Sequence, residues 1–217
     1  MVRDPDFGEL NEQQKESLNQ IYYNAERLET IIDDLLDSQR IELHTMKFKF
    51  SEIGLSKIMD EIYHQNKIYM QDKNILFTNV SSDDVKFKSD PSRLSQVFTN
   101  LIKNSVDFVP DEDGKIEIGA TKENNSILFY VKDNGVGISK EEQKQLFHKF
   151  YQTDTSVTRK HGGTGLGLSI CKGIVDHLGG KIWIESMPKT GTTVLLAYLF
   201  LSRYFYLHLK SIMHHMV

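Results

Sequence analysis

A row of amide side chains runs along one side of the segment of residues 93–108. The members of this row follow one another at helical spacing and end in a carboxylate: Gln96, Asn100, Asn104 and Asp107. The opposite side carries the apolar residues of a helix that faces a core: Leu94, Val97, Phe98, Leu101 and Phe108. Asparagine is a mediocre helix former, because its side chain competes for backbone hydrogen bonds. Two asparagines one turn apart therefore indicate a polar face that has a specific function and is not simply a solvent-exposed surface.

Three glycine-rich stretches carry the other candidate chemistry. They are VKDNGVGIS at residues 131–139, GGTGLGLSI at residues 162–170 and PKTGTTV at residues 188–194. A glycine-rich loop that leads into a helix presents bare backbone N–H groups, and the helix dipole favours an anion there. GGTGLGLSI is therefore a candidate phosphate cradle, although such loops also serve as plain turns. It follows neither the Rossmann nor the Walker pattern.

Asp133 stands where a predicted strand ends, beside the glycines of DNGVGI. A buried carboxylate at this place can accept a hydrogen bond from an exocyclic amine such as that of adenine. The alternative is a turn aspartate that caps its own loop. The hexapeptide alone leaves both interpretations open.

The hydrophobic pattern predicts an α+β fold that positions these residues. Asp90-Pro91 is a typical start for the amide-bearing helix, with an aspartate cap and proline at the first helical position. Alternating apolar residues predict two hairpins, residues 115–121 with 127–132 and residues 181–186 with 192–199. Further helices are expected at residues 52–71, 140–147 and 166–178, and strands at residues 74–80 and 85–88. Helices and antiparallel hairpins at this density predict a two-layer sandwich.

A narrow apolar seam marks the first segment of the chain. Its members are spaced alternately three and four residues apart: Leu18, Ile21, Ala25, Leu28, Ile32, Leu35 and Gln39. This heptad pattern predicts a long helix that pairs along its length, in a bundle or a homodimer. The alternative is an amphipathic helix that lies on the domain that follows.

Composition narrows the function classes. The 217 residues carry a net charge of −4, which gives no reason to expect nucleic acid as a partner. Cys171 is the single cysteine, so no internal disulfide can form and a reducing compartment is expected. The sequence shows no signal peptide and no stretch of roughly 18 apolar residues that could span a bilayer. The aromatic-rich residues 201–217 fit a packed helix, an added tail or a surface-associating segment.

Taken together and in order, the motifs resemble the ATP-binding catalytic domain of sensor histidine kinases of two-component systems. The asparagine helix matches the N box of that family, and DNGVGI, LFHKFYQ, GGTGLGL and GTT match its G1, F, G2 and G3 boxes. Gyrase, Hsp90-type chaperone and mismatch-repair ATPases are wider relatives in the GHKL superfamily. NAERLETIIDDLLDSQRIE looks like the second helix of the dimerisation and phosphotransfer hairpin. The resemblance implies a mixed sheet with helices on one face, preceded by the long helix.

The resemblance also implies ATP and Mg²⁺ as cofactors. Asn104 would give an oxygen to Mg²⁺, Asn100 would line the phosphate channel, and Asp133 would bind the adenine amine. A lid over about residues 148–163 would bring the basic residues Arg159 and Lys160 toward the γ-phosphate. The other nucleotide-contacting residues that the resemblance implies are Gly135, Gly137, Ile138, Phe147, Phe150, Gly163, Thr164, Gly165, Leu166, Gly167, Leu168 and Thr192.

Two residues depart from the family pattern, and both departures remove positive charge near the nucleotide. Asp107 stands where the family usually has Lys or Arg, and Gln152 stands where the lid often has Arg. We therefore expect weaker ATP binding than in a typical member of the family.

The phosphoacceptor of the family has no match in this sequence. None of the eight histidines is followed by an acidic residue and then by proline at the family's spacing. We expect residues 1–46 to be a partial dimerisation region, residues 47–200 the catalytic domain and residues 201–217 a tail. The expected protein is a cytoplasmic histidine kinase that cannot autophosphorylate as this chain. It would phosphorylate a first hairpin helix supplied in trans, for relay to a response regulator receiver domain.

Two other function classes stay open. An ATP hydrolase needs a carboxylate that activates water. The hydrolase relatives carry a glutamate four residues before the first asparagine of the helix. This sequence has Gln96 there, and an amide cannot act as a general base near neutral pH. A degenerate module would hold nucleotide, or nothing, and would act through its helix seam. Asp107 and the unmatched acceptor keep this second class open beside the leading kinase hypothesis.

Overall fold

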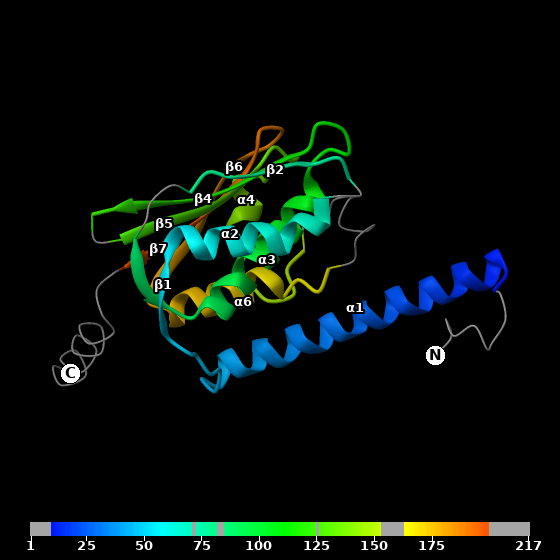
Figure 1. The fold of residues 1–217 in the computed structure, drawn as a ribbon, viewed down its shortest axis with the longest axis horizontal. Helices are drawn as coiled ribbons and strands as arrows, with labels where there is room; N and C mark the ends of the chain where they lie inside the picture. Colours follow the sequence, from blue (N-terminus) through cyan, green and yellow to red (C-terminus); the bar gives the residue numbers. More distant parts are fainter. Residues whose placement is uncertain (1–9, 71–72, 82–84, 125, 153–162, 200–217) are drawn as a thin grey trace.

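The computed structural model describes residues 10–70, 73–81, 85–124, 126–152 and 163–199, and it shows a two-layer α+β arrangement behind a long helix (Figure 1). The helical elements are α1 (Glu12–Glu42), α2 (Leu55–Asn66), the 3-10 helix η2 (Lys67–Met70), α3 (Pro91–Phe108), α4 (Lys140–Gln143) and α6 (Gly167–His177). The strands are β1 (Ser51–Gly54), β2 (Leu76–Asn79), β3 (Lys86–Ser89), β4 (Lys115–Glu123), β5 (Ser126–Asp133), β6 (Gly180–Met187) and β7 (Gly191–Leu199).

A five-stranded mixed sheet in the order β2-β4-β5-β7-β6 forms one layer. β2 runs parallel to β4, and the other neighbouring pairs are antiparallel. Both predicted hairpins are confirmed, as β4–β5 and β6–β7. The pairing of β5 with β7 sets Asp133 opposite Thr192. Two glycine-rich motifs, whose paired residues are 59 positions apart in sequence, therefore meet where the neighbouring strands β5 and β7 end and begin.

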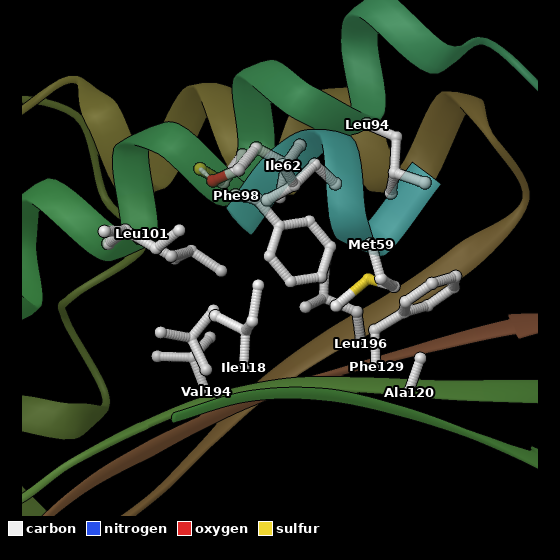
Figure 2. Close-up of a cluster of buried hydrophobic side chains, with 14 of the residues drawn as sticks. Met59, Ile62, Leu94, Phe98, Leu101, Ile118, Ala120, Phe129, Val194 and Leu196 are labelled. Atoms are coloured by element: carbon white, nitrogen blue, oxygen red, sulfur yellow. Dashed lines mark hydrogen bonds between the residues drawn. The ribbon is translucent and has the colours of Figure 1, made fainter. Parts of the chain in front are cut away.

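Helices α2, α3 and α6 form the second layer and cover one face of the sheet (Figure 1). Figure 2 shows the ring of Phe98, from α3, pointing toward the strands, with Met59 of α2 beside it and Phe129 and Leu196 below. The rings of Phe98 and Phe129 meet edge to face, with centroids 5.9 Å apart. The apolar side of α3 is thus anchored in the core, and its amide row faces the other way.

The start of α3 agrees with the sequence prediction. The Asp90 side chain accepts a hydrogen bond from the backbone N–H of Arg93 at 3.1 Å, and proline follows at the first helical position. Its other carboxylate oxygen accepts from the backbone N–H of Lys49 at 2.6 Å. This cap fixes both where α3 begins and how the preceding chain approaches it.

Helix α1 is confirmed as a long helix, and its N-terminus is closed by a capping box of Asn11 and Gln14. Its C-terminal part lies beside α6, while its N-terminal part extends away from the two layers (Figure 1). In this single chain the seam faces solvent, with Ile21 65% and Leu28 58% exposed. A helical partner for the seam stays a prediction.

Two helix predictions were wrong in part. Residues 52–54, expected at the start of a helix, belong to β1, which pairs with β3 and sets Ile53 opposite Phe87. The strands expected at 74–80 and 85–88 are confirmed as β2 and β3, which belong to different sheets. The helix expected over residues 140–147 ends at Gln143, and turns follow.

Residues 201–217 lie outside the described part of the chain. Among the described helices, none combines the length and the apolar character needed to cross a membrane.

Candidate functional site

A cavity of about 550 Å³ opens between α3, the loop after β5 and the start of α6. The predicted nucleotide residues that line it are Asn100, Asn104, Asp133, Gly137, Ile138, Gly163, Thr164, Gly165, Gly167, Leu168 and Thr192. These residues come from motifs scattered between residues 100 and 192, and the fold brings them to one place. The volume is that of an ordinary small-molecule site.

Asp133 forms one end of the cavity. Its Oδ2 accepts a hydrogen bond from the hydroxyl of Ser105 at 3.0 Å. Its Oδ1 accepts from the backbone N–H groups of Gly135 at 2.9 Å and Thr192 at 3.1 Å. Burial raises the pKa of Asp133, and the three hydrogen bonds oppose that rise without cancelling it. The aspartate thus caps its own loop and also faces the cavity, so the two sequence interpretations are compatible.

Two glycines shape the loops around the cavity. Gly137 has a φ of +70°, and a Cβ there would lie 1.9 Å from the carbonyl oxygen of Met187. Gly165 has a φ of +69°, and a Cβ there would lie 2.9 Å from the Cα of Phe150. An L-residue at either position would have to displace backbone atoms, so both positions require glycine.

The asparagines of α3 line the middle of the cavity. The side-chain nitrogen of Asn100 is buried, and within the described residues it forms no hydrogen bond of regular geometry, although the Asn100 side chain interacts with the Cys171 thiol. A phosphate oxygen is an acceptor that such an N–H group would take. Mg²⁺ is usually held by one or two protein oxygens together with phosphate oxygens and water, and the Asn104 carboxamide can supply one such oxygen. The residues present therefore fit a magnesium nucleotide.

The start of α6 forms the other end. The hydroxyl of Thr164 accepts a hydrogen bond from the backbone N–H of Leu166 at 3.1 Å. Gly167 and Leu168, in the first turn of α6, border the cavity. Because a helix N-terminus favours negative charge, this is the end that suits phosphate groups.

Helix α1 supplies a wall of the cavity that the sequence did not predict. Its lining residues are Tyr23, Arg27, Thr30, Ile31 and Asp34. The Thr164 hydroxyl donates a hydrogen bond to Asp34 Oδ2 at 2.8 Å, which ties α1 to the phosphate end. Burial is the main cause that raises the pKa of Asp34; the Thr164 bond lowers it and the nearby Asp37 raises it. The sequence showed Asp34 only as one of the charges that flank the heptad seam.

A second contact of α1 lies at the start of α3. Asp37 is buried, and its Oδ2 accepts hydrogen bonds from Gln96 Nε2 at 2.8 Å and Arg93 Nη1 at 3.3 Å. Arg40 binds the other oxygen at 3.2 Å. Gln96 therefore helps to dock α1 against α3. From the sequence it mattered only because an amide cannot activate water as the glutamate of a hydrolase would.

Several predicted residues do not line the cavity. Gly135 is not part of its lining, Leu166 is buried in the hydrophobic core, and Phe147 packs against that core. The side chain of Phe150 is 67% exposed. Arg159 and Lys160 lie outside the described residues, as does most of the expected lid, so these lid residues stay predictions.

The two departures from the family pattern both border the cavity. Asp107 lines it at the C-terminal turn of α3. Gln152 lines it too, and its amide nitrogen donates a hydrogen bond to the carbonyl oxygen of Gly163. Lys103, also in the lining, holds its ammonium group 5.0 Å from the ring centre of Tyr69.

Comparison with known proteins identifies the family. Residues 89–203 match the model of the histidine kinase-, DNA gyrase B- and HSP90-like ATPases. The chain is 36% identical over 190 residues to the circadian input-output histidine kinase CikA of Synechococcus elongatus, which covers 86% of this chain and 25% of CikA. The chain thus spans about a quarter of the length of that relative.

Solved structures share the fold. Full-length ShkA in complex with AMPPNP aligns with a TM-score of 0.76 at 20% identity, over 88% of this chain and 39% of ShkA. The histidine kinase ThkA in complex with the response regulator protein TrrA aligns with a TM-score of 0.68 at 27% identity, over 88% of this chain and 53% of ThkA. The chain therefore belongs to the histidine kinase-, DNA gyrase B- and HSP90-like ATPase family, and it is similar to the ATP-binding catalytic domains of sensor histidine kinases.

Proposed function

We propose that this chain is the catalytic part of a two-component sensor kinase that transfers the γ-phosphoryl group of Mg-ATP to a histidine outside these 217 residues. The supporting observation is the convergence, in one cavity, of the Asp133 carboxylate, the two asparagines of α3 and the N-terminus of α6. One end offers an acceptor for an amine, and the other offers donors for phosphates.

Each group has a defined task in this proposal. Asp133 accepts a hydrogen bond from the adenine amine. Asn104 gives an oxygen to Mg²⁺, and the metal neutralises charge on the phosphate oxygens when it is bound. Asn100 and the first turn of α6 donate N–H groups to the phosphates. Because phosphoryl transfer depends mainly on positioning and charge neutralisation, these groups supply what the step needs from this domain.

The phosphoryl acceptor and the later steps also belong to the proposal. The sequence has no histidine in the family's acceptor pattern, so the acceptor would be a separate first hairpin helix. The seam of α1 would pair with that helix or with a second copy of this chain. Since the related kinase ThkA has a structure with a response regulator, we propose that the phosphoryl group then passes to a receiver-domain aspartate. ATP is a cytoplasmic metabolite, and we propose that the chain works in that compartment.

The acidic residues near the cavity distinguish the two competing functions, an ATP hydrolase and a degenerate binding module. A hydrolase would use a carboxylate on α3 to activate water, but that helix contains no glutamate. Its one acidic residue, Asp107, borders the cavity. A degenerate binding module is the stronger alternative, because Asp34 and Asp107 both bring negative charge to the cavity.

The test is a transfer assay with a separately produced acceptor-bearing hairpin, Mg²⁺ and radiolabelled ATP. We expect acid-labile, alkali-stable label on the hairpin, and almost none on it with Asn104→Ala. Asn24→Ala makes the same change at an exposed position of α1 and should transfer like the wild type. ATP binding without transfer would favour the binding module, and rapid hydrolysis without the hairpin would favour a hydrolase.

A further inference from the structure

Ser105 is a polar residue on the buried side of α3. It is 5% exposed, whereas its buried neighbours on the helix, Leu101, Ile102 and Val106, are apolar. A buried hydroxyl is costly unless it is hydrogen-bonded. The Ser105 hydroxyl donates its proton to Asp133 Oδ2 at 3.0 Å, and Ser105 lines the cavity next to that carboxylate.

Counting the acceptor positions of Asp133 shows what this bond does. An ionised carboxylate has about four lone-pair positions, two on each oxygen. On Oδ1 both are used, by the backbone N–H groups of Gly135 and Thr192. On Oδ2 Ser105 uses one. A single acceptor position is left for a ligand in the cavity.

We propose that Ser105 is a positioning residue that makes this site prefer 6-aminopurine nucleotides over 6-oxopurine nucleotides. The proposal rests on the nucleotide-binding function proposed above. A 6-aminopurine presents an N–H group, which pairs with the one remaining acceptor position. A 6-oxopurine presents a carbonyl oxygen, and two acceptors facing one another in a buried place cannot bond.

Loss of the Ser105 hydroxyl changes this match in two ways. The carboxylate loses one of three restraints, so it is held less firmly in the orientation that the amine needs. Oδ2 also becomes free to carry a proton, and the neutral acid can donate that proton to a 6-oxo group. The pKa of Asp133 is consistent with this second effect, because burial raises that pKa and the hydrogen bond from Ser105 lowers it. Removing the bond therefore raises that pKa further.

Charged side chains do not dominate the ionisation of Asp133. The charged residues that line the same cavity are Arg27, Asp34, Lys103, Asp107 and Glu142. The causes of its pKa shift are burial and the three hydrogen bonds from Gly135, Ser105 and Thr192. A pH-dependent difference between the wild type and a Ser105 variant would thus report on the bond itself.

The experiment is calorimetric titration of the full chain with the magnesium complexes of the β,γ-imido analogues of ATP and GTP, between pH 5.5 and 8. For Ser105→Ala we expect about tenfold weaker binding of the ATP analogue at pH 7, the size expected for a lost hydrogen bond to a charged group. Binding of the GTP analogue should change less than about twofold. ATP-analogue affinity should also begin to fall at a higher pH than in the wild type, because the ionised carboxylate is the acceptor.

Ser95→Ala is the matched control. It deletes the same hydroxyl from α3, about 15 Å along the helix from Ser105, and it should leave both affinities unchanged. Ser105→Cys keeps the shape but offers only a weak donor, so it should fall between the wild type and Ser105→Ala. Unfolding is no obstacle, since alanine favours helix and the change removes one atom.

The outcomes separate the two proposals. If the wild type prefers the ATP analogue and Ser105→Ala keeps the same preference and pH profile, the role of Ser105 is refuted and the kinase proposal stands. If the wild type binds neither analogue, the proposed function fails and the role of Ser105 fails with it.

Discussion

Asp34 places a carboxylate at the phosphate end of the cavity, so we expect Asp34→Asn to tighten nucleotide binding. The Asp34 carboxylate, on α1, accepts a hydrogen bond from the Thr164 hydroxyl. The same hydroxyl accepts a hydrogen bond from the backbone N–H of Leu166. The carboxylate thus stands near a place where phosphate groups would bind. Asparagine keeps an oxygen that can accept the Thr164 hydroxyl, so the contact with α1 is preserved while the charge is removed.

The contact distances set the magnitude. Asp34 Oδ2 lies 2.8 Å from the Thr164 oxygen, which lies 3.1 Å from the Leu166 nitrogen. A phosphate oxygen bound at the N-terminus of α6, about 3 Å beyond that nitrogen, would lie within roughly 9 Å of the carboxylate. Two unit charges at that distance repel by about 2 kcal/mol at an effective dielectric constant of 20. Asp34 is half-buried, so solvent and salt reduce the repulsion to about 1 kcal/mol, or about fivefold in Kd.

A fluorescent ATP analogue titrated in the presence of Mg²⁺ measures the effect. Asp33→Asn removes the same charge from the exposed neighbouring residue, and it should change Kd by less than about twofold. The gain from Asp34→Asn should shrink as the pH falls through the raised pKa of Asp34, because the wild type then carries a neutral acid as well. A variant that binds no more tightly than the wild type, or an equal gain from Asp33→Asn, would refute the reasoning.

Three further changes test other parts of the site. Asp107→Lys restores the usual family charge in the cavity lining and should lower the Kd for the same analogue several-fold; unchanged binding would mean that this position does not reach the phosphates. Gly137→Ala forces a Cβ to within 1.9 Å of the Met187 carbonyl oxygen at a φ of +70°, so we expect at least about 2 kcal/mol lower stability in denaturant titration and loss of nucleotide binding. Gln96→Glu sets a second carboxylate against Asp37, so amide exchange along α1 should accelerate while ATP hydrolysis stays low.

The elements with strong local signals were predictable from sequence. The Asp90-Pro91 start of α3 depends on a side-chain cap within the same turn, and both hairpins depend on alternation on either side of a short turn. Strand β1 lacked such a signal. Its residues pair with β3, more than 30 positions away in the chain. Ile53 satisfies a helical pattern as readily as a strand pattern, so only this long-range partner decides between them.

The same limit applies to the site. Asp133 and the asparagines of α3 could be chosen from sequence because each lies in a motif whose order matches a known family. Ser105 gave no such signal: on a helix projection it is one more small residue between the apolar positions. Its role depends on the carboxylate that β5 brings 3.0 Å from its hydroxyl. Sequence reasoning found residues that line the cavity, and it missed Ser105, which we propose holds one of them in place.

Gln96 shows how tertiary structure changes the meaning of a residue. From the sequence, its importance is that an amide cannot act as a general base. In the structure its amide N–H groups matter, because one of them donates to the buried carboxylate of Asp37 at 2.8 Å. A glutamate here would face that carboxylate with like charge and would weaken the docking of α1. The residue type that disfavours hydrolysis is therefore also the type that lets α1 dock against α3. Asp34 lies one turn from Asp37 on the same helix and lines the cavity. The contact between Gln96 and Asp37 therefore also helps to hold the part of α1 that forms a wall of the cavity.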